Sequence, residues 1–155
     1  TPSSAGVHIG QTSFATTGTL DLHLTDDETA IHAAINALVS TGLTNLKEGI
    51  ELATGELDDI HVPHERPATP DVMVIITDGA PNQPTNSATA QALAAAAADS
   101  ARLAGVEIFV VGVGVTGSTE TYLKTDIADD ALHYFSVVDF DDLEAILKGL
   151  PVCSD

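Results

Sequence analysis

Apolar and polar residues alternate near the start of the chain. Residues 18–24 place a leucine at every second position, which is the period of a strand with one face toward solvent. A second short segment, about 5–14, precedes it across a Thr-Thr-Gly turn at 16–18. The pattern predicts a β-hairpin with strands over about 5–14 and 18–24.

Two amphipathic helices are expected next. Thr25 precedes three acidic residues at 26–28, which is typical of an N-cap followed by an acidic first turn, and the apolar stripe of this helix runs to Val39. The second helix carries apolar residues at spacings of four and three, and these form a single face: Leu46, Ile50, Ala53, Leu57 and Ile60.

The next segments predict a parallel sheet. Residues 71–77 and 107–113 are nearly continuous apolar runs of strand length, which is typical of strands covered by helices on both faces. The alanine-rich segment 88–104 lies between them and is followed by Gly105, a common helix stop. We therefore expect a strand–helix–strand unit with two parallel strands.

The end of the chain predicts one more strand and one more helix. Residues 133–138 have the composition of a strand, and Asp139 is a suitable N-cap for a closing helix that ends near Gly149 and Pro151. The elements add up to a single α/β domain over residues 1–155, with helices packed on a mainly parallel sheet.

The net charge narrows the classes of partner. The 155 residues include 23 acidic and 5 basic ones, which gives a formal net charge of -18. Such a chain repels the phosphates of nucleic acids and anionic membranes, so we expect neither as a partner. No apolar run approaches the ~18 residues of a membrane span. Divalent cations, basic proteins or a salty medium suit this charge better.

Two loops carry the candidate chemistry. Ligands of open parallel sheets bind beyond the carboxyl ends of the strands, where Asp78 follows the strand 71–77. The second loop, 40–45, contains Thr44 and Asn45 and leads into a helix. Each loop also has an ordinary structural interpretation, because Asp-Gly is a common turn and either Thr44 or Asn45 would cap the helix.

Two weaker patterns point to other ligands. Residues 112–117 satisfy G-x-G-x-x-G, but they follow a late strand and we expect no helix to open at the last glycine, so a dinucleotide is not favoured. His61 and His64 would be two ligands of a metal in a proline-containing loop, but the sequence offers no evident third ligand.

Taken together, four segments resemble the von Willebrand factor A domain family, in the right order and over nearly the whole chain. They read TGLTNL at 41–46, VIITDG at 74–79, GVEIFVVGVG at 105–114 and YFSVVDFDDL at 134–143. The resemblance implies a doubly wound α/β fold with a mainly parallel sheet, one antiparallel edge hairpin and helices on both faces.

The resemblance also implies a metal-ion-dependent adhesion site (MIDAS). In that family a D-x-S-x-S motif, a Thr and an Asp surround Mg²⁺ or Mn²⁺, and Thr44 and Asp78 match the Thr and the Asp; Ca²⁺ is a further candidate. An acidic side chain of a partner protein, an exposed Asp or Glu, completes the coordination. Oxygen ligands suit these hard cations.

The chain departs from the family pattern at its start. It contains no D-x-S-x-S, and the family's first strand and first helix are absent. That strand lies between the hairpin and strand 71–77, so we expect the hairpin to be separated from the parallel sheet and two strand edges to lie open. Either a segment preceding Thr1 or a neighbouring subunit would supply the central strand.

Cys153 leaves two interpretations open. It is either a free thiol near the end of the chain or half of a disulfide whose partner lies outside this chain, which requires an oxidising compartment. Extracellular members of the family often tie their two ends by a disulfide, and the resemblance implies the same here.

The sequence is compatible with two classes of function and argues against a third. The first is a secreted or surface-exposed adhesion module that binds a protein carboxylate through a divalent cation. The alternative is a metal-independent structural module of an extracellular filament or matrix. An enzyme is not expected, because no nucleophile–base pair is evident and Asp78 as a phospho-acceptor would need a lysine beyond a strand. The three lysines are expected on or near helices: Lys47, Lys124 and Lys148.

Overall fold

A computed structural model of the chain describes residues 7–58, 70–138 and 142–149. The first elements are β1 (Ile9–Phe14), β2 (Gly18–Thr25), α1 (Glu28–Ala37) and α2 (Leu46–Glu56). They are followed by β3 (Val72–Thr77), α3 (Ser87–Leu103), β4 (Glu107–Val113), α4 (Gly117–Tyr122), the π-helix η1 (Leu123–Ile127), β5 (Tyr134–Val137) and α5 (Leu143–Gly149). The order and the types of element confirm the predicted α/β class.

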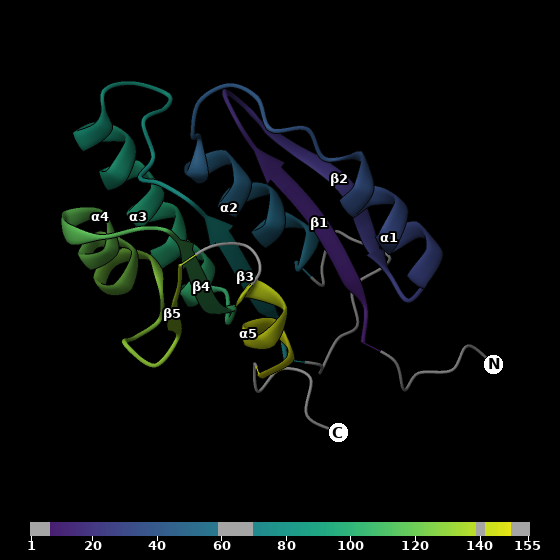
Figure 1. Cartoon of the computed structure of the whole chain (residues 1–155). Coiled ribbons are helices and arrows are strands. Elements are labelled where there is room, and N and C mark those ends of the chain that lie inside the picture. Colours follow the sequence, from purple (N-terminus) through teal and green to yellow (C-terminus); the bar gives the residue numbers. More distant parts are fainter. Residues whose placement is uncertain (1–6, 59–69, 139–141, 150–155) are drawn as a thin grey trace.

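The described strands form two sheets that are not joined to each other. β1 and β2 make an antiparallel pair, and β3, β4 and β5 make a parallel sheet in that order. Figure 1 shows the hairpin on one side of α2 and the parallel sheet on the other. The predicted separation of the hairpin from strand β3 is therefore confirmed, and β1 and β3 each have one edge without a partner among the described strands.

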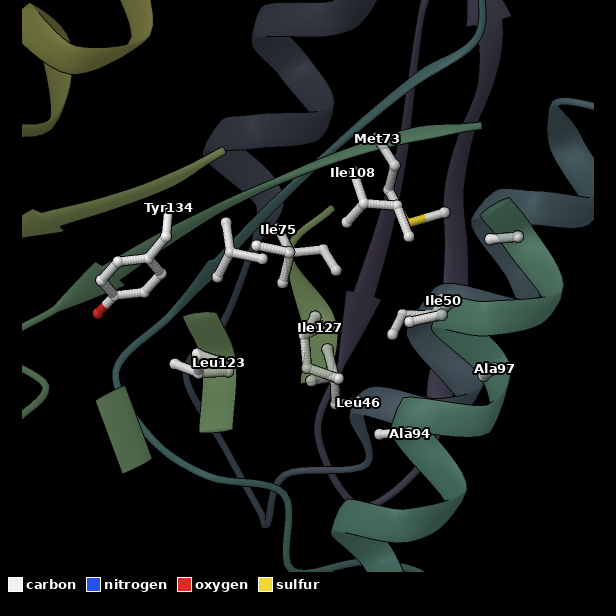
Figure 2. Close-up of a cluster of buried hydrophobic side chains, with 14 of the residues drawn as sticks. Leu46, Ile50, Met73, Ile75, Ala94, Ala97, Ile108, Leu123, Ile127 and Tyr134 are labelled. Carbon is white, nitrogen blue, oxygen red and sulfur yellow. The ribbon is translucent and has the colours of Figure 1, made fainter. Parts of the chain in front are cut away.

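The main hydrophobic core lies on one face of the parallel sheet. Alternate residues of β3 and β4 point to this face and meet α2, α3 and η1, as Figure 2 shows. Five alanines of α3 are buried, and their small side chains let the helix lie close to its neighbours. The labelled members of the core are Leu46, Ile50, Met73, Ile75, Ala94, Ala97, Ile108, Leu123, Ile127 and Tyr134.

The opposite face of the sheet has a smaller core. Val111, Val113 and Val137 are buried there, and Leu143 and Ile146 of α5 pack against them. Val74, in the middle of β3, points to the same face as Ile76 but is 36% exposed. Helices thus cover both faces, as predicted, but the cover over β3 is incomplete.

The hairpin is also sandwiched between two helices. The Thr12 hydroxyl donates to the carbonyl of Gly49 in α2, while the neighbouring Gln11 side chain donates to the carbonyl of Ala34 in α1. Figure 1 shows α2 and α1 on different sides of the hairpin. Phe14 packs so closely on Gly49 that a Cβ there would lie 2.7 Å from the phenyl ring.

The first helix begins and ends differently from the prediction. Asp27, not Thr25, is its N-cap, since the Asp27 carboxylate accepts from the amides of Thr29 and Ala30. Thr25 instead accepts from the amide of Asp27. The helix stops at Ala37 because Leu38 is already extended, so the end of the predicted stripe, including Val39, is exposed.

The segment after β4 forms a helix that the sequence did not indicate. Gly117, with φ of 66°, opens α4, which runs directly into η1. The prediction that no helix opens at Gly117 is therefore wrong. The Tyr122 hydroxyl donates to the carbonyl of Gln91 in α3 at 2.9 Å, and burial raises the pKa of Tyr122, with Asp126 adding to it.

The remaining predicted bounds hold to within a few residues. The second helix ends at Glu56, and the alanine-rich helix covers 87–103 rather than 88–104. The Asp139 cap, His61, His64 and Cys153 lie outside the described residues. No helix in the described part of the chain is both long and apolar enough to cross a bilayer.

Candidate functional site

The carboxyl end of β3 shapes the first candidate loop. Thr77 ends the strand and is buried, and its hydroxyl donates to the carbonyl of Gly79 and accepts from the amide of the same residue. This hydroxyl-centred turn redirects the chain at Asp78. Asp78 itself is exposed, so its carboxylate lies at the edge where ligands of parallel sheets bind.

The second candidate loop is hydrogen-bonded to the first. The Asn82 side-chain oxygen accepts from the amide of Thr44 at 2.9 Å. The carbonyl of Thr44 in turn accepts from the amides of Asn82 and Gln83, at 3.0 and 3.3 Å. The structure therefore brings the Thr44 loop against the loop that Asp78 begins.

The same loop is also fixed to the hairpin. Asn45 is 1% exposed, its amide donates to the carbonyl of Ala15 at 2.8 Å and its side chain donates to the carbonyl of Thr16. Asn45 is the N-cap of α2, because its side-chain oxygen accepts from the amide of Glu48. Of the two possible caps, Asn45 takes this role and Thr44 does not.

The two side chains matched to the family site have oxygen atoms that suit a hard cation. In the part of the chain that the structure describes, neither the Thr44 hydroxyl nor the Asp78 carboxylate has a hydrogen-bond or ion-pair partner. Mg²⁺, Mn²⁺ and Ca²⁺ prefer hydroxyl, carboxylate and water oxygens, so the donor types fit. The same described ranges hold no cluster of three or more His, Cys, Asp or Glu side chains that would bind a metal by themselves. That Thr44 and Asp78 bind a metal stays a prediction.

The other described candidates are glycines and lysines, which offer no carboxylate or hydroxyl to a cation, although the glycine-rich loop follows β4, whose carboxyl end lies beside that of β3. The glycines of the G-x-G-x-x-G pattern include Gly114 and Gly117, both with positive φ, and lead into the six-residue helix α4. The lysines lie on helices, as expected: Lys47 on α2, Lys124 on η1 and Lys148 on α5.

Asn82 is the residue of this region that the sequence analysis missed. Its contact with Thr44 joins residues 38 positions apart, and an asparagine after Asp-Gly-Ala-Pro has the composition of any turn. The signal in the sequence is that the loop is rich in side chains that hydrogen-bond to backbone groups. This signal does not identify Thr44 as the partner of Asn82.

The fold and this edge define the class of protein. An α/β domain carries a hydroxyl loop and a carboxylate loop side by side at the carboxyl end of a parallel strand. The family model that matches the chain is the von Willebrand factor type A domain, over residues 2–149. The chain therefore belongs to the von Willebrand factor type A domain family. No curated protein matches it.

Solved structures share the fold. Proximal thread matrix protein 1 from the mussel byssus, with a zinc-occupied MIDAS motif, is 20% identical over 94% of this chain and 35% of that chain, with a TM-score of 0.75. The vWF domain of the pilus tip protein Mfa5 from Porphyromonas gingivalis is 12% identical over 94% of this chain and 81% of that chain, with a TM-score of 0.72. Manganese-loaded TRAP from Plasmodium vivax is 14% identical over 97% of this chain and 59% of that chain, with a TM-score of 0.68. The chain spans about a third of the length of the mussel protein.

Proposed function

We propose that this chain is an adhesion or protein-binding module that binds an acidic side chain of a partner protein through a divalent cation. The observation that carries the proposal is the meeting of the Thr44 loop and the Asp78 loop at the carboxyl end of β3. Family membership supports the same conclusion, because the two residues match the family's Thr and Asp.

Thr44 and Asp78 would supply two of the ligands of the cation, with Mg²⁺ or Mn²⁺ as the expected ion; because the chain contains no D-x-S-x-S, further ligands would come with the strand that completes the sheet. When bound, the ion offers an open coordination position to the carboxylate of the partner. The net charge of -18 favours binding of cations and disfavours direct contact with an acidic partner, so the ion would also neutralise the repulsion. Zinc and manganese in the mussel and Plasmodium vivax structures support a divalent ion at this type of site.

We also propose that the protein is extracellular or lies at the cell surface and that it has no enzymatic activity. The structural neighbours include a byssus matrix protein and pilus proteins, which supports this location. Binding through an ion requires no nucleophile or general base, so the absence of a nucleophile–base pair in the sequence fits a binding module.

A second candidate function follows from the two open strand edges. β1 pairs only with β2, and β3 pairs only with β4, among the described strands. Such edges add a further strand readily, because their backbone amides and carbonyls are available. We propose that an additional strand, from a preceding segment or from a neighbouring subunit, completes the sheet. Completion by a neighbouring subunit would make the chain a structural module of a filament or matrix.

Metal binding tests the first function. We expect Mn²⁺ to bind to the domain once its central strand is supplied, as measured by calorimetry, and Asp78→Ala to weaken binding at least tenfold because a charged ligand is lost. Asp21→Ala is the matched control, since Asp21 is an exposed carboxylate on β2 and belongs to neither loop of the site. Equal Mn²⁺ affinity in Asp78→Ala and Asp21→Ala would show that the assignment of Asp78 is wrong.

The second function is tested by the mass of the protein from its natural source. Native mass spectrometry would find either a longer chain that includes this sequence or a complex with a second chain, and hydrogen exchange at β3 would be slower in that species than in the 15.9 kDa chain alone. A natural species of 15.9 kDa with fast exchange along β3 would exclude an additional strand from either source.

A further inference from the structure

One residue of the loop after β3 holds both backbone polar groups of Thr44. The side-chain oxygen of Asn82 accepts from the Thr44 amide at 2.9 Å, and the Asn82 amide donates to the Thr44 carbonyl at 3.0 Å. Two hydrogen bonds from one residue to the two sides of another fix both its distance and its orientation. The direction in which the Thr44 side chain leaves the backbone is therefore set by Asn82.

The neighbouring residue is held from the opposite side. Asn45 is bonded to the hairpin turn through its amide and its side chain, and it caps α2. Thr44 thus lies between two anchors, one on the hairpin and one on the loop that begins at Asp78. Removing the Asn82 side chain takes away the hydrogen bond to the Thr44 amide and so loosens the anchor that relates Thr44 to the Asp78 loop, while the Asn45 contacts and the backbone bonds to the Thr44 carbonyl remain.

We propose that Asn82 is a positioning residue that sets Thr44 against the Asp78 loop before a cation arrives; this inference rests on the proposed metal-dependent function. Preorganised ligands bind more tightly because less ordering occurs on binding. Side chains that orient metal ligands without touching the metal change its affinity by about 10- to 100-fold when they are replaced.

The chain offers a matched control four residues away. Asn86 also accepts a backbone amide through its side chain, that of Thr89, and caps α3. Asn86→Ala therefore removes a similar hydrogen bond from the same connecting loop without touching Thr44. Asn82→Asp keeps an acceptor oxygen at the position that faces the Thr44 amide.

The first measurement is amide hydrogen exchange by NMR in the metal-free chain. We expect Asn82→Ala to speed exchange of the Thr44 amide about tenfold relative to Asn86→Ala, which is the loss of one backbone hydrogen bond of ordinary net strength. Asn82→Asp is expected to restore the protection. If Thr44 is equally protected in Asn82→Ala and Asn86→Ala, Asn82 does not hold the loop and the inference is overturned.

The second measurement is Mn²⁺ affinity in the same variants. Asn82→Ala is expected to weaken Mn²⁺ binding by about 10- to 100-fold, while Asn86→Ala stays near the wild-type value. If the Thr44 amide exchanges faster in Asn82→Ala but the Mn²⁺ affinity is unchanged, the positioning role is overturned and the proposed function is left intact. A wild-type domain that binds no Mn²⁺ even with its central strand supplied would overturn the proposed function together with any role toward a metal, while the exchange data would still decide whether Asn82 holds the two loops together.

Discussion

Among the described residues, none from Val7 to Thr44 is buried, whereas the chain from Asn45 onward supplies every buried member of the main core. The parallel sheet is held by apolar contact on both faces, with Ile108, Val110 and Val111 fully buried in β4. The hairpin has half-buried leucines on β2, and its α1 has no buried residue at all.

Polar contacts take a larger share in holding the hairpin. The Glu48 carboxylate accepts from the amide of Gly18, and the buried Glu56 carboxylate accepts from the amide of Leu24 and contacts the ring of His23 at 3.0 Å. Hydrogen bonds contribute less net stability than burial of large side chains, because water competes for them in the unfolded chain. The parallel sheet is therefore the more stable part of the molecule, and the hairpin depends on α2.

The largest effect is expected from a matched pair of truncations in the two regions. Ile108→Ala, in fully buried β4, should lower the free energy of unfolding by about 2–5 kcal/mol, since it removes transfer free energy and leaves a cavity. Leu20→Ala, on half-buried β2, should cost about 1 kcal/mol. Urea unfolding followed by circular dichroism measures both. Equal costs would show that the hairpin is packed as tightly as the parallel sheet.

The contact between the hairpin and α2 can be tested with two glycines of one helix. An alanine Cβ at Gly49 would lie 2.7 Å from the ring of Phe14, whereas one at Gly55 has no atom within 4 Å. Gly55→Ala should stabilise the protein by up to about 1 kcal/mol through helix propensity. Gly49→Ala gains the same propensity but overpacks the interface at a cost of about 1–3 kcal/mol.

The unfolding free energies of these two variants are the readout. Gly49→Ala is expected to be less stable than Gly55→Ala by about 1–3 kcal/mol. Two equally stabilised variants would mean that Phe14 of β1 does not press on α2, and the dependence of the hairpin on this helix would have to be abandoned.

Periodicity predicted most of the fold because burial follows it closely. The apolar run of β4 is buried on both faces, that of β3 is buried on the face toward the main core, and the single face of α2 meets the same core. The helix over 117–127 was missed for the opposite reason. Its buried side chains, Tyr122, Leu123 and Ile127, give only one helical interval, the four positions from Leu123 to Ile127, which is too little to predict a helix. A π-turn closed by the Ala128 amide on the Leu123 carbonyl places them in the core.

The candidate site was predictable only in part. Thr44 and Asp78 were assigned by resemblance, and the geometry that brings their loops together depends on Asn82, a contact across 38 positions. Glu56 was missed similarly, because a buried carboxylate at the end of an amphipathic helix is indistinguishable in sequence from an exposed one until its partners on β2 are known.

The smallest expected effect concerns an ionic contact of the parallel half. His133, before β5, lies between two carboxylates, with Nδ1 2.7 Å from Asp130 and Nε2 2.8 Å from Glu107 at the start of β4. Only the protonated ring donates to both. The hydrogen bond with Asp130 raises the pKa of His133, burial opposes this and Glu107 adds to it, so the net shift is upward. The same hydrogen bond is the main reason why the pKa of Asp130 is lowered.

The direction of the pH dependence follows from these shifts. A group whose pKa is higher in the folded state contributes stability that is complete below its unfolded pKa, about 6.5 for histidine, and is lost as pH rises through the folded value. For Asp130 the contribution is present above about 4 and is lost as pH falls through its lowered pKa. The contact should therefore stabilise the fold most between about pH 4 and 6.5 and weaken above that range.

Thermal unfolding from pH 5 to pH 8 isolates this contribution when wild type is compared with His133→Gln. The difference in melting temperature should be largest at pH 5–6 and shrink toward pH 8, because the neutral ring can donate to only one of the two carboxylates. His32→Gln is the control, since His32 is exposed on α1 and lies 3.9 Å from a single carboxylate, that of Glu28. If the difference in melting temperature between wild type and His133→Gln does not change with pH, the protonated ring of His133 does not help to join β4 to the segment before β5. The parallel half would then be held by apolar burial, without a contribution from this charge.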